Sequence, residues 1–358
     1  MDPNFNSNEK PNTDNFNNYN PNDYANNSAK YDPGYNPNQN PPIYNQNFNA
    51  NNSANYNPPN YNPNFNPSNN PNYNANYNPN FAPNNHANPK PTLAFFGATG
   101  GCTLACLAPA LQAGYNCIAL VRTPAKLTNL LITRGISPST LSSHLTLIEG
   151  STTDKEAVHR TLYPDNLPPV SMIISGVGGA PDFSSPLHPK FVGKTICQDT
   201  VRNIFDCLRS MHSPEDPEQS KPVLVVISTT GLTEKRDIPL AMVPLYKWGL
   251  KIPHADKEVM EKLILEEVGR PAHERVVRSH IVVRPSWLND GVSQKEKVRA
   301  LKGQGEGQNT SVGISCPFVG YTISREDVAG FMFGVVEGLE NEKADGRQYF
   351  GSFVSISH

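Results

Sequence analysis

A glycine-rich turn near residue 100 carries the clearest chemical signal in the chain. An apolar run at residues 93–96 leads into Gly97-Ala98-Thr99-Gly100-Gly101-Cys102-Thr103. A small-residue helix pattern at 104–113 and a second apolar run at 117–121 follow. Glycines let the backbone approach a pyrophosphate closely, and the N-terminus of a helix offers it free N–H groups and a positive dipole. The order strand, tight turn, helix and strand therefore predicts a dinucleotide site, rather than a glycine turn of some other α/β protein.

The cation after the second apolar run predicts which dinucleotide binds. A carboxylate at this place hydrogen-bonds the 2′-hydroxyl of NAD, whereas a guanidinium suits a 2′-phosphate. Arg122 occupies the position and Lys126 follows it, with no carboxylate between them. We therefore expect NADP, with NAD as the alternative cofactor.

Two residues of the turn lead to specific expectations. Thr103 stands at the third small position, where a glycine normally allows close packing of helix and strand. We expect the threonine to push the helix slightly outward or to replace a water, and its hydroxyl could bind phosphate. Gly100 should need a backbone path that a Cβ would obstruct, either at positive φ or against the pyrophosphate.

Strand-length apolar runs alternate with helix patterns through the rest of the chain. Alternation of this kind predicts an α/β fold, a Rossmann-type doubly wound parallel sheet with right-handed crossovers. Ligands of such sheets bind beyond the carboxyl ends of the strands. Strands are expected at residues 93–96, 117–121, 145–148, 171–175, 223–228 and 281–283, and helices at 104–113, 125–133, 155–162, 195–211 and 256–268.

The first ninety residues have a different composition from the rest. They are rich in Asn, Pro and Tyr and contain almost no aliphatic residues. Such a segment cannot offset the ~1–2 kcal/mol per residue that backbone ordering costs. Residues 1–90 are therefore predicted to be a long disordered tail, either inert or self-associating through its Tyr, Phe and Asn side chains. Residues 91–358 should form one NAD(P)-binding Rossmann domain with a small C-terminal subregion on the substrate side.

Composition and charge exclude several classes of function. The chain has 358 residues and a formal net charge of −2, with no basic run, so we expect no direct nucleic-acid binding. Its apolar runs are of strand length and its N-terminus is polar, so we expect no membrane association. Six cysteines without a CxxC pair predict reduced thiols and a cytoplasmic protein, with the nucleus as the alternative compartment. Cys102 and Cys106 lie four apart, but no nearby ligand completes a set, so no metal site is expected.

Polar and small residues follow several of the predicted strands. Ser151 can bind a base edge, although capping of the next helix explains its segment equally well. Gly176 and Val177 would let a ribose or nicotinamide approach the backbone, unless they form only a flexible loop. The expected cofactor-binding residues are Gly97, Thr99, Gly100, Gly101, Cys102, Thr103, Arg122, Lys126, Ser151, Gly176, Val177, Ser228, Lys257, Arg284 and Pro285.

The motifs taken in order resemble a known family. Gly97-Ala98-Thr99-Gly100, Arg122 with Lys126, Val283-Arg284-Pro285 with Leu288 and Gly291, and the segment Tyr321 to Ala329 resemble the atypical short-chain dehydrogenase/reductases. The most similar branch is the NAD(P)-binding, NmrA-like group, which includes flavin and biliverdin reductase-type enzymes. The resemblance covers residues 92 to about 353 and implies the fold and the dinucleotide cofactor. It does not identify a substrate. It also implies that the segment at residues 323–329 opens a late helix, with Asp327 in its first turn.

One departure from this family concerns the proton donor. The main branch uses Tyr-x-x-x-Lys, in which the tyrosine donates a proton and the lysine lowers the pKa of the phenol. Lys257 stands at the lysine position, but Pro253 replaces the tyrosine, and Tyr246 with Lys251 has the wrong spacing. His254 could substitute as the donor. The alternatives are a solvent-facing histidine and a Lys257 that only pairs with Glu261.

Two functions from different classes remain open at this point. The leading prediction is an NADPH-dependent oxidoreductase acting on a small organic acceptor, which would bind under the loop at 284–291 and the segment at 316–321. Lys257, His254, Ser228 and Thr230 are its candidate catalytic residues. Without a tyrosine acid, acceptors that need little proton help are favoured, such as flavins, quinones or conjugated carbonyls. The alternative is a non-catalytic redox sensor that acts through a regulatory protein partner.

Overall fold

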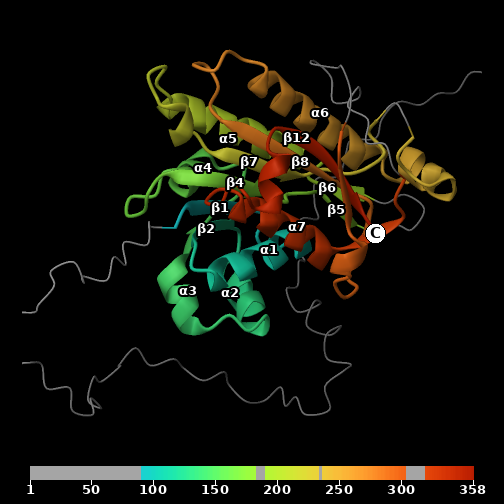
Figure 1. The fold of residues 1–358 in the computed structure, drawn as a ribbon, viewed down its shortest axis with the longest axis horizontal. Coiled ribbons are helices and arrows are strands. Elements are labelled where there is room, and N and C mark those ends of the chain that lie inside the picture. Colours follow the sequence, from blue (N-terminus) through green and yellow to red (C-terminus); the bar gives the residue numbers. More distant parts are fainter. Residues whose placement is uncertain (1–89, 183–189, 234–235, 304–318) are drawn as a thin grey trace, which may run out of the picture. The chain divides into compact units, whose positions relative to one another are not determined.

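An eight-stranded sheet organises the part of the chain that the computed structural model describes, residues 90–182, 190–233, 236–303 and 319–358 (Figure 1). Its order is β10-β12-β8-β7-β4-β1-β2-β3, and all neighbours are parallel except β10 and β12. The tail predicted at residues 1–90 lies outside the described residues apart from Lys90. The strands are β1 (Thr92–Phe96), β2 (Asn116–Val121), β3 (Leu145–Glu149), β4 (Val170–Ser175), β7 (Val223–Ile227), β8 (Ser279–Pro285), β10 (Arg299–Lys302) and β12 (Ser352–Ser357).

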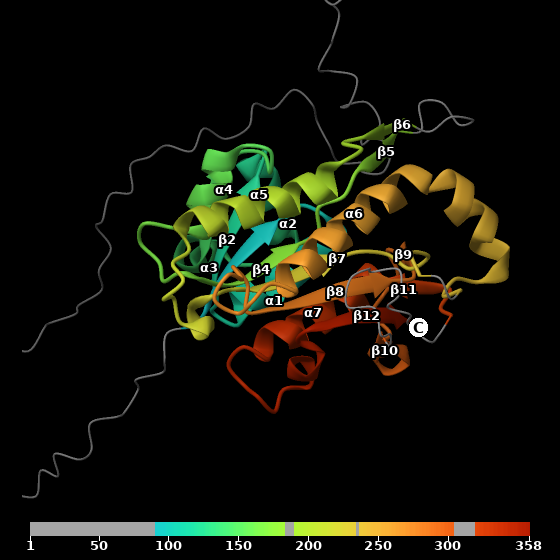
Figure 2. The same ribbon diagram turned by 90° about the horizontal axis from the view of Figure 1, so that it is seen from above.

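Helices cover both faces of the sheet (Figure 2). Alternate residues of β1 show the two layers, because Leu93 and Phe95 pack into the core beneath α1, α2 and α7, whereas Ala94 and Phe96 pack beneath α4, α5 and α6. The helices are α1 (Gly101–Gln112), α2 (Pro124–Thr133), α3 (Pro138–His144), α4 (Lys155–Leu162), α5 (Ile196–Met211), α6 (Lys251–Val268) and α7 (Arg325–Glu337). This arrangement confirms the predicted Rossmann-type α/β fold.

Several elements differ from the sequence-based expectation. Helix α6 begins at Lys251 rather than near residue 256, and it follows a π-helical turn, Leu245–Gly249. Strand β12 was not expected, because its serines interrupt the apolar pattern; it is nevertheless buried along most of its length beside β8. Helix α3 and strand β10 were also not expected. Two-stranded sheets form from β5 (Ala180–Asp182) with β6 (Lys190–Val192), and from β9 (Trp287–Asn289) with β11 (Thr322–Ser324).

The strand order reverses direction at β1, which places a crevice at the sheet edge there. Strand β1 pairs with β2 on one side and with β4 on the other, and the chain crosses over between them. Gly97 follows β1 and Gly176 follows β4, and the Gly176 N–H donates to the Phe96 carbonyl at 3.0 Å. Open α/β sheets bind ligands at this kind of switch point. No helix in the described ranges is long and apolar enough to cross a bilayer.

Candidate functional site: a glycine-walled crevice at the sheet edge

The turn after β1 is shaped by Gly97 rather than by Gly100. Gly97 has φ +75°, and a Cβ on it would lie 3.0 Å from backbone atoms of Gly176 and Val177. Gly100 caps α1 with φ −77°, so the positive φ considered for it is not found there. A Cβ at Gly100 would still lie 3.1 Å from the Gly97 carbonyl oxygen, which is tighter than an ordinary contact. A side chain would therefore be strained at Gly97, whereas at Gly100 it would require the Gly97 carbonyl to shift by a few tenths of an ångström.

Thr103 faces β4 instead of the crevice. A Cβ on Gly176 would lie 1.9 Å from the Thr103 Oγ1. Close packing of α1 against β4 therefore depends on the glycine that follows β4, whereas in this motif it usually depends on a glycine in the helix. Thr103 is 1 % exposed, and its hydroxyl has no hydrogen-bond partner in the described part of the chain. This position explains why a threonine is tolerated at the third small position.

A cavity of about 280 Å³ lies at the crevice beside β1, beyond the carboxyl ends of β1, β2, β3 and β4. Glycine backbone forms much of its wall, and the N-terminus of α1 opens beside it, so the residues present fit the pyrophosphate of a dinucleotide. The cavity brings together seven of the residues predicted to bind cofactor. Its lining is Gly97, Ala98, Thr99, Gly100, Leu120, Val121, Arg122, Gly150, Ser151, Thr152, Gly176, Val177, Gly178, Gly193 and Ile196.

The other predicted cofactor residues do not line this cavity. Gly101 is exposed and lies against the Arg325 side chain, since a Cβ on Gly101 would lie 2.3 Å from the Arg325 Cδ. Cys102 is buried, and burial raises the pKa of its thiol to about 11. Lys126 is exposed on the first turn of α2. Besides these three, the residues outside the lining are Thr103, Ser228, Lys257, Arg284 and Pro285.

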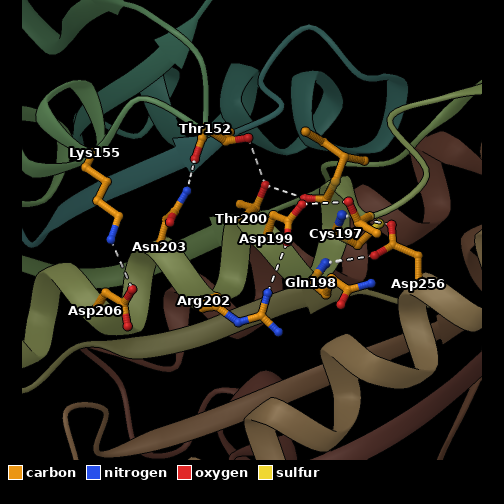
Figure 3. A network of polar contacts seen from close by, with 12 residues as sticks. Thr152, Lys155, Cys197, Gln198, Asp199, Thr200, Arg202, Asn203, Asp206 and Asp256 are labelled. Carbon is orange, nitrogen blue, oxygen red and sulfur yellow. Dashed lines mark hydrogen bonds and ion pairs between the residues drawn. The ribbon is translucent and has the colours of Figure 1, made fainter.

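Helix α5 fixes the loop that carries Ser151. The Thr200 hydroxyl donates to the Thr152 Oγ1 at 2.9 Å, and the Asn203 Nδ2 donates to the Thr152 carbonyl at 2.8 Å (Figure 3). These contacts hold the loop after β3 against the cavity. Capping is provided separately by Asp154, whose carboxylate accepts from the N–H groups of Glu156 and Ala157.

Asp256 joins α6 to the N-terminus of α5. Its carboxylate accepts hydrogen bonds from the backbone N–H groups of Cys197 at 2.9 Å and Gln198 at 3.0 Å (Figure 3). The Cys197 thiol in turn donates to the Val177 carbonyl at 3.3 Å, in the loop after β4. Asp256 is thereby linked through Cys197 to Val177, which lines the cavity. Sequence reasoning missed this contact, because nothing local relates residue 256 to residue 197.

A buried ion pair lies behind the ends of β7 and β8. Arg284, predicted to touch the cofactor, is completely buried, and its Nη2 lies 2.7 Å from the Glu261 Oε2. The Ser228 hydroxyl donates to the Glu261 Oε1 at 2.5 Å. Lys257 does not pair with Glu261 here, since its ammonium donates to the Ile227 carbonyl at 2.6 Å. The ion pair thus ties α6 to both strand ends, while Lys257 stays at the end of β7.

His254 is packed against an aromatic ring rather than facing solvent. Its ring centroid lies 5.3 Å from that of Tyr246, in an edge-to-face arrangement. Burial, with a smaller effect of the Lys257 charge, lowers the pKa of His254 to about 4. Burial also raises the pKa of Tyr246, and Lys257 is not among the groups that shift it. Both groups are therefore neutral near pH 7, and Tyr246 does not reproduce the lysine-activated phenol.

Two fungal proteins are similar to the chain over most of its length. It is 44 % identical to reductase pytE of Aspergillus terreus over 280 residues, which cover 76 % of this chain and all of the relative. It is 37 % identical to oxidase pynE of Aspergillus niger over 271 residues, or 68 % of this chain and 92 % of the relative. The chain belongs to their family. No family model matches the chain.

This membership fits the resemblance found in the motifs. The chain is an oxidoreductase, and its motifs resemble those of the NAD(P)-binding, NmrA-like group of atypical short-chain dehydrogenase/reductases. Among solved structures, the anaerobillin reductase ChuY of Escherichia coli O157:H7 is 17 % identical with a TM-score of 0.47, over 74 % of this chain and 96 % of that chain. The oxidoreductase ylbE of Lactococcus lactis is 10 % identical with a TM-score of 0.47, over 75 % and 90 %.

Proposed function

We propose that the protein is an NADPH-dependent reductase of a small organic acceptor. The observation that carries this proposal is the glycine-walled cavity beside β1, with Arg122 at the end of β2 on its lining. The redox names of both fungal relatives support an enzyme over the sensor that the missing tyrosine left open.

Charge at the cavity supports NADP over NAD. Arg122 is exposed on the lining, and the lining residues include no carboxylate that could bind a ribose 2′-hydroxyl. A guanidinium is a bidentate donor suited to a phosphate. Lys126 lies on the first turn of α2, outside the cavity lining, and adds a second positive charge after the end of β2.

Residues at the end of β7 are assigned to the reacting side of the site. Bound NADPH supplies a hydride, so the acceptor gains a hydride and a solvent-derived proton while NADPH is oxidised to NADP⁺. Lys257 is held by the Ile227 carbonyl, where its ammonium can bind a ribose hydroxyl. Ser228 keeps its position through Glu261, and Thr230 contacts Pro285. Neutral His254 can hydrogen-bond the acceptor without transferring a full proton at neutral pH.

Absorbance at 340 nm tests the proposal directly. NADPH consumption is followed with ferricyanide, menadione, FMN and an aromatic aldehyde as acceptors, for the wild type and for Lys257→Ala. We expect turnover with at least one acceptor, and a kcat lowered by about 10²-fold or more in the variant if Lys257 serves the reacting side. Tight NADPH binding without turnover of any acceptor would instead support the sensor.

A further inference from the structure

The Arg325 side chain lies against the helix N-terminus that adjoins the cavity. A Cβ on Gly101, the first residue of α1, would lie 2.3 Å from the Arg325 Cδ and 3.0 Å from its Nε. Gly100, the residue before it, lines the cavity. Arg325 is the first residue of α7, and its side chain is 32 % exposed. Gly101 therefore leaves room for a solvent-accessible cation next to the cavity.

Helices α1 and α7 lie side by side and run in the same direction (Figure 1). Arg325 meets Gly101 at their first turns. Beyond their C-terminal ends, the Tyr115 hydroxyl donates to the Glu340 Oε2 at 2.5 Å. The positive ends of two helix dipoles are therefore neighbours, and the first turn of α1 contains no carboxylate.

The position of Arg325 is unfavourable for the folded chain alone, because a cation at a helix N-terminus opposes the helix dipole. The two carboxylates of the same turn contact other groups, Glu326 with Arg134 and Asp327 with serine and histidine side chains. The Arg325 Nη1 lies 2.7 Å from the Asp290 Oδ1, but the Asp290 side chain is 88 % exposed, and so exposed a pair adds little stability. An anion between the guanidinium and the first N–H groups of α1 would remove the conflict.

Lys257 places the same turn of α1 along the expected dinucleotide. Burial raises the pKa of the Cys102 thiol to about 11, and the charges of Arg325 and Lys257 oppose this rise. Both cations therefore lie near the first turn of α1. Arg122 is assigned to the adenosine end of the dinucleotide and Lys257 to the nicotinamide ribose, so the group between them is the pyrophosphate.

We propose that Arg325 binds the pyrophosphate of the dinucleotide and gives up its ion pair with Asp290 to do so. A guanidinium suits this role, because its parallel N–H groups match the oxygens of a phosphate. Asp290 belongs to the loop under which the acceptor is expected to bind, so the dinucleotide detaches this loop from Arg325. The proposal rests on the dinucleotide binding that the proposed function requires, and not on turnover.

Isothermal titration calorimetry with NADPH, NADH and ADP-ribose tests the contact. All three ligands carry the pyrophosphate, so Arg325→Ala should weaken each by about tenfold or more. Arg325→Lys, which keeps the charge without the parallel donors, should restore part of the affinity. Arg134→Ala is the matched control, because Arg134 is 31 % exposed and pairs with Glu326, the next residue of α7. It should leave all three affinities unchanged. Unchanged affinities in Arg325→Ala would overturn the proposal.

Asp290 distinguishes a ligand contact from a structural role. Asp290→Asn should tighten NADPH binding about two- to fivefold, because Arg325 then has no carboxylate to leave. If the ion pair only shaped the loop, Asp290→Asn and Arg325→Ala would both lose affinity, and this outcome would refute the exchange. Thermal melts add a second measurement. Arg325→Ala should melt no lower than the wild type, since its cation opposes the helix dipoles.

Turnover separates this proposal from the proposed function. NADPH binding that depends on Arg325, without NADPH oxidation by any acceptor, would refute the reductase while supporting the pyrophosphate contact. NADPH oxidation with a Kd for NADPH that Arg325→Ala leaves unchanged would overturn the contact while supporting the reductase. A wild-type chain that binds none of the three ligands would overturn both.

Discussion

At the scale of single residues, the site depends on groups whose roles follow from what they contact. Gly97 and Gly176 line the cavity at positions where a Cβ would lie 3.0 Å or less from neighbouring atoms. Arg122 is an exposed cation on the same cavity. Arg284, a cation as well, has a different role because it is buried against Glu261. Residue type alone therefore does not decide whether an arginine binds a ligand or stabilises the fold.

Arg122 should discriminate between the two dinucleotides. A charge-assisted hydrogen bond to the 2′-phosphate contributes about 1.5–3 kcal/mol, or one to two decades in affinity. Arg122→Ala should therefore weaken NADPH binding about 10- to 100-fold, with little change for NADH, as measured by isothermal titration calorimetry. Lys126→Ala is the control, with a smaller loss because Lys126 lies off the cavity lining. Equal losses for both dinucleotides in Arg122→Ala would refute NADP selectivity.

The glycine wall predicts a graded response to added methyl groups. Gly97→Ala introduces a Cβ at positive φ and 3.0 Å from backbone, so we expect a loss of about 1–3 kcal/mol in stability and strongly weakened NADPH binding. Gly178→Ala is matched, since Gly178 also lines the cavity but has nothing within 4 Å of its Cβ position. Thermal melts and NADPH titration of both variants check this. Similar behaviour of the two would show that the turn geometry does not matter.

Neutralising one member of the buried Arg284–Glu261 ion pair should cause a large loss of stability. Glu261→Gln removes the carboxylate charge that lies 2.7 Å from the buried Arg284 guanidinium, which should cost about 3–5 kcal/mol. Glu258→Gln on the same helix disrupts an exposed pair with Lys262 and should cost about 0.5 kcal/mol or less. Urea denaturation compares the two variants. A small loss in Glu261→Gln would mean that Arg284 finds another partner.

At the scale of elements, α6 is held at both sides of Lys257. Asp256 joins it to the N-terminus of α5, and Glu261 joins it to β7 and β8. The lysine between them is thereby kept at the end of β7. A helix fixed by two carboxylates can place one side chain more accurately than a loop, which suits a reacting side chain.

Loss of the Asp256 contacts should affect both stability and cofactor binding. Asp256→Ala leaves two N–H groups at the start of α5 without an acceptor, which should cost about 0.5–2 kcal/mol. It should also weaken NADPH binding, because Cys197 supports the Val177 loop at the cavity. Ser137→Ala removes the cap of α3 and is the control, with a stability loss but unchanged NADPH affinity. An unchanged affinity in Asp256→Ala would limit Asp256 to a structural role.

At the scale of the whole molecule, two core layers enclose the sheet. The free energy of unfolding at acidic pH depends on titratable groups that are buried in these layers. His280 lies against Phe353 in this interior, and burial lowers its pKa from 6.5 to about 4. The unfolded chain therefore binds a proton in the range between these two values that the folded chain does not. The folded state loses stability as the pH falls through this range, and recovers it as the pH rises.

The pH dependence can be measured in the full-length chain. The free energy of unfolding should fall by about 1.4 kcal/mol for each pH unit between about 6.5 and 4 on account of His280. His280→Leu should remove the share of this slope that His280 contributes and leave the share of His254, whose pKa is also lowered to about 4. His273→Leu, at an exposed position, is the control. Urea midpoints at pH 7, 6 and 5 provide the measurement. A slope unchanged by His280→Leu would show that His280 is solvated when folded.

The sequence by itself determined the fold class and the glycine-rich turn that lines the crevice. Apolar strand runs that alternate with helix patterns leave few arrangements that bury both faces of a parallel sheet. The glycine turn is contiguous in the chain, so the position of this turn after the first strand could be predicted. Strand β12 could not, because it is recognisable only once β8 offers it a buried edge. Asp256 and Glu261 act on partners 59 and 23 residues away, and Arg284 becomes buried only when α6 covers the strand ends. The tertiary structure decided these roles, since ion pairs and helix caps across elements depend on distances that no local pattern encodes.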